Sequence, residues 1–364
     1  MAVLFGGRSG EHEVSLRSAA SVVEALRPNH DVVCVRIGKD GGWRLLEGPE
    51  PSPVGGVPVF LAPSPDDGGR LRRLADAVEL ARPDVVFPVL HGTYGEDGTV
   101  QGLLELAGVP YVGAGVAASA VSMDKEMMKA LFARAGLAQV EYVVLRRRDA
   151  AAEADLPARL GLPLFVKPVN LGSSVGVRKV QRVEELGAAI EFAFRFDRKV
   201  IVERGVEARE IEVAVLGNDD PVASVPGEIV PDREFYDYDS KYDPASRTEL
   251  RIPAPVPPAL ADELRRAAVV AFRAVDGAGC ARVDFFLERS SGRVLVNEIN
   301  TLPGFTSISM YPKLWAASGV PYPELVSRLV ELALERHAQR ARLQTDYGAR
   351  QAGRASAPPG DVRG

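Results

Sequence analysis

The chain has 364 residues, which is too long for one simple core and predicts two or three domains. Its 46% hydrophobic and 26% charged residues are typical of a globular protein, and its net charge of −5 gives no reason to expect nucleic-acid binding. Cys34 and Cys280 show neither metal-binding spacing nor a disulfide framework, and the first apolar run is too short for a signal peptide or membrane span. We therefore expect a cytoplasmic protein without a nucleic-acid or membrane partner.

Strands and helices alternate through the N-terminal part of the chain. Apolar runs predict buried strands over residues 2–5, 31–37 and 84–90 and a helix over residues 14–26. Residues 48–70 are rich in Pro, Gly and Asp and predict an exposed excursion, and a helix is expected near residues 71–81. The alternation predicts an open, mostly parallel α/β sheet, whose ligands bind at the carboxyl ends of its strands.

Polar, glycine-rich loops follow the first and the third of these strands. Residues 7–15 open a helix whose free N–H groups could bind an anion, or Glu11 could hold a substrate ammonium group. A structural reading is also open, in which Ser9 is an N-cap and Glu11 is a first-turn acid. The glycines of residues 91–99 favour a binding loop, although His91 by itself could equally be structural.

A second unit is expected to begin near Ser119. It would contain one helix, over 122–135, and four strands, over 140–145, 164–166, 200–203 and 210–216. The Gly- and Ser-rich loop at 168–176 would let backbone N–H groups approach phosphate oxygens, with Lys167 as a positive charge. It is not a P-loop, because the chain has no G-x-x-x-x-G-K-[ST] pattern. Taken alone, the loop could be a plain turn and Lys125 a surface lysine.

Two glutamates, Glu203 and Glu210, flank an apparent bend that contains Gly205. An edge strand followed by such a bend could hold an adenine by backbone hydrogen bonds and a ribose by a carboxylate. Without further context, two solvated glutamates are the simpler interpretation.

Residues 234–253 predict a long functional loop, because structureless loops of that length are otherwise uncommon. The aromatic and charged residues at 234–242 fit either a lid that excludes water from a substrate or a partner-binding surface. Helices are expected over residues 258–276 and 323–340, and a disordered tail from about residue 343.

Residues 282–300 predict a β-hairpin, in which two apolar runs flank a three-residue Ser-Ser-Gly turn with the glycine in the left-handed conformation. Such a turn places Asp284 opposite Glu298 and Arg282 opposite Asn300. Side chains two residues apart share a face of a strand, so the four side chains would converge. Two carboxylates and an amide carbonyl form a hard-oxygen site for Mg²⁺, which phosphate oxygens commonly complete. The hairpin therefore predicts nucleotide chemistry.

A solvated strand face is the alternative interpretation of these polar residues. The same face would also carry Phe286 and Val296 beside the carboxylates, and such apolar neighbours favour a sheltered cleft. The opposite face is predicted to pack on a core through Val283, Phe285, Leu287, Leu295 and Ile299.

Six motifs, taken together, resemble those of the D-alanine–D-alanine ligases, a family of ATP-grasp enzymes of peptidoglycan synthesis. The resemblance runs from Val3 to about Leu334. The motifs are residues 4–15, 91–98, 123–125, 172–176, 235–242 and 297–306. Their combination is specific, whereas the predicted metal site alone would indicate only an ATP-grasp enzyme.

The resemblance implies a three-domain ATP-grasp fold, in which an N-terminal open parallel α/β sheet is followed by two α+β domains that clasp ATP. The implied parts are a substrate-binding domain at 1–118, a central ATP-grasp domain at 119–208, a C-terminal metal-binding domain at 209–342 and a tail at 343–364. It also implies ATP, two Mg²⁺ or Mn²⁺ ions, D-alanine as the substrate and a homodimer, and it is compatible with a monovalent cation.

The resemblance assigns the nucleotide and metal contacts to named residues. The ATP phosphates would be bound by Lys125, Lys167, Ser173 and Ser174, and the adenine and ribose by Glu203 and Glu210. The metal ligands would be Asp284, Glu298 and Asn300, with Glu298 bridging two ions.

The resemblance likewise implies the substrate contacts. Glu11 would orient the ammonium group of the first D-alanine, in a network with Ser173 and Tyr242, and His91 would lie near that substrate. Arg282 and the Gly304 N–H would stabilise the oxyanion, and Ser309 and Met310 would receive the carboxylate of the second D-alanine. Lys241 would be the lid residue that reaches the transferred phosphoryl group.

The implied reaction has two steps, an attack of the first D-alanine carboxylate on ATP and an attack of the second D-alanine amine on the resulting acyl phosphate. Tyr242 implies an amine acceptor, since relatives that make D-alanyl-D-lactate have Phe or a different loop there. The alternatives are a D-alanine–D-lactate or D-alanine–D-serine ligase, and a nucleotide-binding regulatory module without turnover. The module would not need the oxyanion pair.

Overall fold

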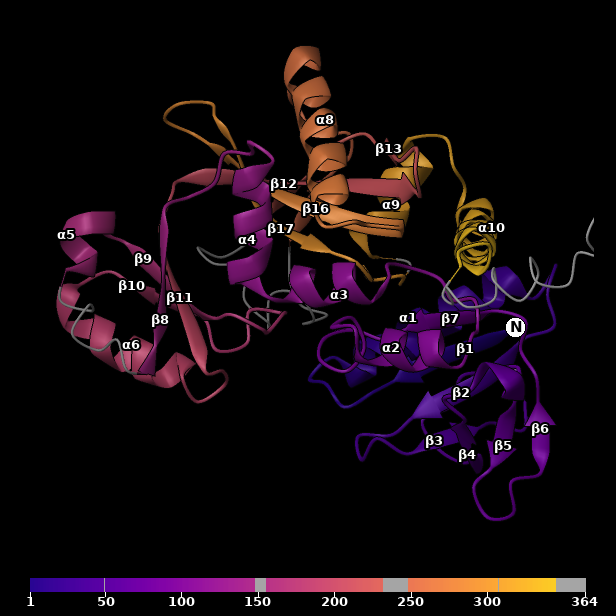
Figure 1. Cartoon of the computed structure of the whole chain (residues 1–364). Coiled ribbons are helices and arrows are strands. Elements are labelled where there is room, and N and C mark those ends of the chain that lie inside the picture. The colour runs from indigo at the N-terminus through magenta and orange to yellow at the C-terminus, as the bar shows by residue number, and fades with distance from the viewer. Residues whose placement is uncertain (49, 148–154, 232–247, 307, 345–364) are drawn as a thin grey trace, which may run out of the picture.

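The computed structural model describes residues 1–48, 50–147, 155–231, 248–306 and 308–344 of the chain. Three sheets carry the fold, and they lie in separate parts of the molecule (Figure 1). The first sheet, with seven strands, belongs to the N-terminal part, the second has four strands, and the third has six.

The predicted parallel α/β sheet is present at the N-terminus. Strand β1 (Ala2–Gly6) lies between β2 (Val33–Ile37) and β7 (Val86–Val89) and runs parallel to both. Helix α1 (His12–Leu26) packs on one face of the sheet and α2 (Thr99–Leu106) on the other. The carboxyl ends of β1 and β7 therefore lie side by side, as the sequence predicted.

An antiparallel extension continues this sheet, in the order β6-β5-β4-β3-β2. It corrects two predictions. The expected exposed excursion at 48–70 contains β4 (Val57–Leu61), in which Val59 and Leu61 are buried, and the expected helix at 71–81 is a pair of strands. The physical reason is that apolar side chains on alternate residues of the extension pack into the same core as β1 and β2. Its other strands are β3 (Trp43–Leu45), β5 (Leu71–Arg73) and β6 (Glu79–Ala81).

The second sheet is antiparallel, in the order β10-β9-β11-β8. Its strands are β8 (Tyr142–Arg146), β9 (Leu164–Pro168), β10 (Arg178–Val180) and β11 (Lys199–Arg204). Helices α5 (Leu156–Leu160) and α6 (Leu186–Ala193) pack on it. The prediction of an edge strand before the bend at Gly205 is wrong, because β11 is paired on both sides.

The third sheet, in the order β15-β14-β12-β16-β17 with β13 paired to β12, is also antiparallel. Helix α8 (Pro258–Ala274) covers one face, together with α4 (Lys125–Arg134), which contributes Met128 and Phe132 to that core. The strands are β12 (Ala208–Gly217), β13 (Val222–Ala223), β14 (Gly227–Val230), β15 (Glu249–Arg251), β16 (Gly279–Glu288) and β17 (Val294–Asn300).

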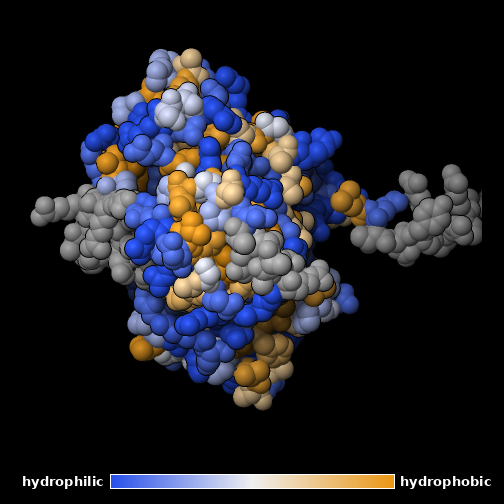
Figure 2. Space-filling model, turned by 90° about the vertical axis from the view of Figure 1, so that its left-hand side faces the viewer, coloured by the Kyte–Doolittle hydropathy of each residue, from blue (hydrophilic) through white to orange (hydrophobic). Residues whose placement is uncertain are grey.

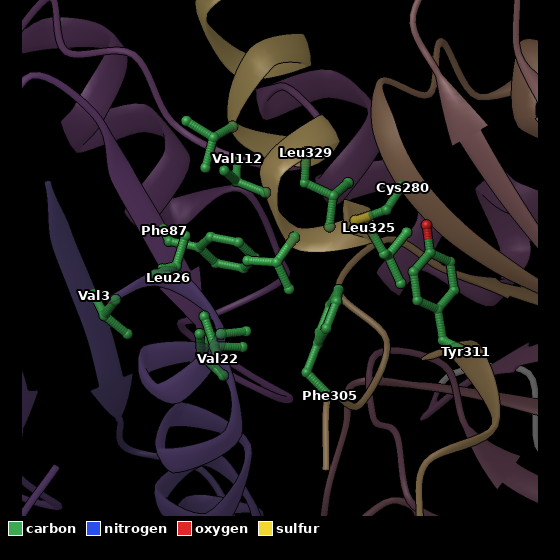
Figure 3. Close-up of a cluster of buried hydrophobic side chains, with 14 of the residues drawn as sticks. Val3, Val22, Leu26, Phe87, Val112, Cys280, Phe305, Tyr311, Leu325 and Leu329 are labelled. Atoms are coloured by element: carbon green, nitrogen blue, oxygen red, sulfur yellow. The ribbon is translucent and has the colours of Figure 1, made fainter. Parts of the chain in front are cut away.

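One hydrophobic core joins the first and third sheets (Figure 3). Phe305, which follows β17, meets Phe87 of β7 edge-to-face at 5.8 Å and Tyr311 at 5.4 Å between ring centroids. Tyr311 lies in α9 (Met310–Ala317), and α10 (Tyr322–Ala341) adds Leu325 and Leu329 to the same core. This packing holds the segment after β17 against the carboxyl end of β7.

Hydrophilic side chains cover most of the face shown in Figure 2, with small groups of hydrophobic ones among them, as is normal for a protein surface. None of the helices in the described ranges is long and apolar enough to cross a membrane. The domain divisions at residues 118, 208 and 342 stay a prediction.

Candidate functional site

The polar face of the β16–β17 hairpin brings the four predicted side chains together. Asp284 pairs with Glu298 and Arg282 with Asn300, as expected. The Arg282 guanidinium donates to both oxygens of Asp284 at 2.7 Å, and its Nε lies 3.0 Å from an oxygen of Glu212. Burial alone would lower the pKa of Arg282, but these carboxylates raise it well above its ordinary value.

The turn of the hairpin and the pairing next to it differ from the prediction. The turn holds four residues, since Glu288 N–H donates to Arg293 C=O, and Gly292 is left-handed with φ of 70°. A β-bulge after Asp284 then restores the expected pairing. Because the bulge shifts the outer half of β17 by one residue, Val296 packs in the core opposite Phe285. The prediction that Val296 lies on the polar face is therefore wrong, and Leu295 is the residue paired with Phe286.

The donor chemistry of this face fits a divalent cation. Asp284 and Glu298 offer carboxylate oxygens, and Asn300, whose amide N–H donates to Asp284 at 3.1 Å, adds an amide on the same face of the hairpin. Within the described ranges, no three His, Cys, Asp or Glu side chains form a metal-binding group. A site with two carboxylates and one amide suits an ion such as Mg²⁺ that keeps positions for phosphate or water oxygens.

A lysine from α4 faces the carboxylates. The predicted helix over 122–135 is interrupted at Asp124, whose side chain accepts from the N–H groups of Glu126 and Met127 and begins α4 at Lys125. Lys125 Nζ donates to Leu171 C=O at 2.7 Å and lies 3.8 Å from Glu298. Burial lowers its pKa, with Glu298 acting against that effect. The helix ahead of Lys125 is α3 (Val116–Met123).

A second lysine, Lys167 of β9, is bound to Glu203 of β11 at 2.6 Å. The other oxygen of Glu203 lies 2.9 Å from Lys129, a buried residue of α4. Burial would raise the pKa of Glu203, but the two lysines outweigh it and hold that pKa well below its ordinary range. Glu210 lies on β12, opposite Phe286. Burial lowers the pKa of Lys167, but Glu203, with a smaller contribution from Glu210, raises it above its ordinary value.

The Gly- and Ser-rich loop reaches from the second sheet to the first. Ser173 and Ser174 have φ of 51° and 58°, a left-handed conformation that is unusual for serine. The Ser173 hydroxyl donates to Glu11, although the two residues are 162 positions apart. The loop thus links the lysines to the N-terminal sheet.

The two glycine-rich loops of the N-terminal sheet meet as predicted. The Ser9 hydroxyl donates to His91 C=O at 2.6 Å and accepts from the Glu11 N–H at 3.2 Å, so it is not a helix cap. His91 is buried between the Ser18 hydroxyl at 3.1 Å and Leu302 C=O at 3.2 Å. Burial lowers the pKa of His91, which keeps its ring neutral beside Glu11.

The segment after β17 brings the last predicted contacts to the same place. A Cβ on Gly304 would lie 2.8 Å from the Ser309 hydroxyl, so a larger residue there would displace that hydroxyl. That hydroxyl accepts from the Thr306 N–H at 3.0 Å, and Met310 begins α9 with its side chain buried. Lys241 and Tyr242 lie outside the described residues.

Sequence reasoning missed three polar residues at this site, which are Lys129, Glu212 and Glu96. The signals were spacings: Lys129 is one helical turn after Lys125, and Glu212 lies on the same strand face as Glu210. Glu96 is half-buried and accepts from the Gly92 N–H at 2.9 Å. Burial and the charge of Glu11 raise the pKa of Glu96 from 4.5 to about 8.

We expect Glu96→Gln to flatten the pH dependence of stability. A carboxyl whose pKa is raised on folding holds its proton in the native state, so stability falls as pH rises from about 4.5 to about 8. Gln keeps the acceptor for the Gly92 N–H but does not ionise. Urea unfolding at pH 5 and pH 8.5 should show a loss in the wild type on the order of a few kcal/mol that the variant lacks. Equal pH dependence in both proteins would contradict this assignment.

Two family models match this chain. Residues 1–114 match the family model described as D-ala D-ala ligase N-terminus, and residues 131–331 match the one described as D-ala D-ala ligase C-terminus. The D-alanine–D-alanine ligase of Heliobacterium modesticaldum is 53% identical over 360 residues, which cover 95% of this chain and 97% of the relative. D-alanine–D-alanine ligase A of Escherichia coli K12 is 48% identical over 356 residues, covering 94% and 98%.

Solved structures are similar over the same length. The D-alanine–D-alanine ligase from Coxiella burnetii has a TM-score of 0.82 and 38% identity, with 97% of this chain and 98% of that chain covered. The VanG D-Ala:D-Ser ligase from Enterococcus faecalis has a TM-score of 0.83 and 36% identity, with 91% and 98% covered. The similarity therefore extends over all three sheets.

Proposed function

Because the chain belongs to the D-alanine–D-alanine ligase family, we propose that it uses ATP to join two D-alanines into D-alanyl-D-alanine for peptidoglycan precursors. ATP and a divalent metal ion are used by this family, and we propose two Mg²⁺ or Mn²⁺ ions here, an arrangement compatible with an additional monovalent cation. The observation that carries the proposal is the meeting of lysines with a carboxylate-lined face, Lys125 lying 3.8 Å from Glu298. The phosphate oxygens of a metal–triphosphate complex are complementary to the lysines, and its metal ion is complementary to the carboxylates.

The proposed nucleotide contacts follow from this polarity. Lys125 and Lys167 bind phosphoryl oxygens. The N–H groups of Ser173 and Ser174 bind them as well, from the loop whose Leu171 C=O accepts from Lys125. Glu203 and Glu210 are proposed to contact adenine and ribose, Glu203 through its backbone, because its two carboxylate oxygens face Lys129 and Lys167. Asp284, Glu298 and Asn300 would hold the ions, which when bound neutralise charge on the phosphoryl oxygens.

In the proposed first step, a carboxylate oxygen of D-alanine attacks the γ-phosphorus of ATP, and the bond to ADP breaks. Glu11, fixed by the Ser173 hydroxyl, attracts the ammonium group of that D-alanine, and neutral His91 lies beside it without repelling the ammonium group. Lys241 and Tyr242 are proposed to approach from the segment outside the described residues, Lys241 at the transferred phosphoryl group.

In the proposed second step, the amine of the second D-alanine attacks the acyl carbon, the carbon–oxygen bond to phosphate breaks, and the amine proton is lost. Arg282 and the Gly304 N–H stabilise the oxyanion that forms. The Ser309 hydroxyl and the N–H at the start of α9, at Met310, receive the second carboxylate. A closed lid would keep water from the acyl phosphate.

Phosphate release from ATP and Mg²⁺ tests this function. We expect release with D-alanine and none above background with L-alanine, together with D-alanyl-D-alanine detected by mass spectrometry. Release that is equal for both enantiomers, or absent for both, would contradict the proposal. A nucleotide-binding regulatory module predicts ATP binding without phosphate release.

A second candidate is a D-alanine–D-serine ligase, because VanG, named as such, is similar over 91% of this chain. A D-alanine–D-lactate ligase is a third. Competition assays with D-alanine plus D-serine or D-lactate separate them by the product mass, and we expect the D-alanyl-D-alanine product to dominate. The substrate ATP supports a cytoplasmic location, and the proposed homodimer can be checked by light scattering.

A further inference from the structure

The lysine that the sequence did not single out, Lys129, occupies an unusual position. Its side chain is 1% exposed, and its ammonium group lies 2.9 Å from one oxygen of Glu203 and 5.4 Å from the centre of the Tyr142 ring. The second oxygen of Glu203 accepts from Lys167 at 2.6 Å. Two lysines thus share one carboxylate that is itself only 3% exposed.

The three lysines near Glu203 differ in what they can reach. The side chains of Lys125 and Lys167 are 13% and 15% exposed, whereas Lys129 is closed off. Lys129 lies on α4 one turn after Lys125, and its ammonium group contacts one oxygen of Glu203 while Lys167 contacts the other. Lys129 is therefore in no position to meet a ligand that Lys125 and Lys167 would bind.

Contact of Lys167 with a ligand would weaken its ion pair with Glu203, and Lys129 offsets that loss. If Lys167 turns its ammonium group toward a triphosphate, it weakens its bond to Glu203. A buried carboxylate that loses its cation is strongly destabilised. Among the described residues, Lys129 is the other cation in contact with Glu203, and it can remain there while Lys167 moves.

We propose that Lys129 is a positioning residue that keeps Glu203 neutralised, so that Lys167 is released to contact the phosphates of ATP. This inference rests on the proposed function of Lys167 as a phosphate ligand. It deepens that function by assigning the affinity for ATP partly to a residue that touches no part of the nucleotide. Without Lys129, Glu203 would hold Lys167 and compete with the triphosphate.

The test is Lys129→Met, which keeps the length of the side chain and removes its charge. We expect the KM for ATP, and the Kd for Mg²⁺-ADP measured by calorimetry, to rise at least about tenfold, which is 1.4 kcal/mol. The KM for D-alanine should stay within about twofold, because the D-alanine contacts lie on other elements. Lys129→Arg, which keeps the charge, should recover most of the affinity.

A double-variant cycle separates this role from plain loss of packing. Glu203→Gln has no carboxylate to be neutralised, so Lys129→Met in that background should change nucleotide affinity by less than about twofold. An equal loss in both backgrounds, or unchanged ATP affinity in the single variant, would overturn the proposal. The outcome is distinct from failure of the proposed function, in which the wild type would release no phosphate, since the calorimetric cycle requires only nucleotide binding.

Discussion

Glu298→Gln is expected to lower the rate of ADP formation at least about a thousandfold, because a neutral amide removes a negative ligand where metal and phosphate charges must be balanced. Glu298 lies on the polar face of β17, opposite Asp284 and 3.8 Å from Lys125. The substitution keeps the shape of the side chain. A coupled assay of ADP with saturating D-alanine and varied Mg²⁺ measures the effect.

The fold of this variant should remain intact. The Glu298 side chain is 29% exposed, so we expect its unfolding free energy to change by no more than about 0.5 kcal/mol. Glu288→Gln is the matched control, since Glu288 lies at the far end of the same hairpin and contacts Arg204 at 3.4 Å. The control should keep its activity within about twofold. Undiminished turnover in Glu298→Gln would remove the metal assignment.

Arg282→Met is expected to reduce both activity and stability. Its loss takes away the proposed donor to the developing oxyanion, which costs about a hundredfold to a thousandfold in kcat. It also takes away the cation that contacts Asp284 at 2.7 Å and Glu212 at 3.0 Å, which destabilises the fold by about 3 kcal/mol. Steady-state kinetics and urea unfolding measure the two effects separately.

Arg282→Lys distinguishes the two causes. It restores a positive charge between Asp284 and Glu212 and should recover stability, while the bidentate geometry is lost and kcat stays low. Arg293→Met, on the exposed end of the hairpin, is the matched control and should be neutral. If Arg282→Lys had wild-type kcat, or Arg282→Met were as stable as the control, the corresponding role would be refuted.

Several features of the site could be predicted from local sequence. The alternation of Arg282, Asp284, Glu298 and Asn300 fixed one shared face, because side chains on a strand repeat every two residues. The meeting of the loops after β1 and β7 was also predictable, because parallel strands bring their carboxyl ends together.

The antiparallel extension of the first sheet was not predictable in this way. Its strands β3, β5 and β6 have three residues each, which is too short for a clear period, and their partners supply the burial that makes them strands. The same limit explains the bulge in the hairpin. A four-residue turn and an extra residue in β17 offset each other, so the expected pairs formed for a different reason.

The sequence by itself determined which groups are available: carboxylates two residues apart on one strand face, lysines at a helix start and a strand end, and glycines where a left-handed backbone is needed. The tertiary structure decided which of them share a charge. Ser173 reaches Glu11 across 162 residues, and Glu203 is divided between Lys129 and Lys167. Such contacts depend on the packing of separate sheets, and buried charges take the partner that is nearest in space, not in sequence.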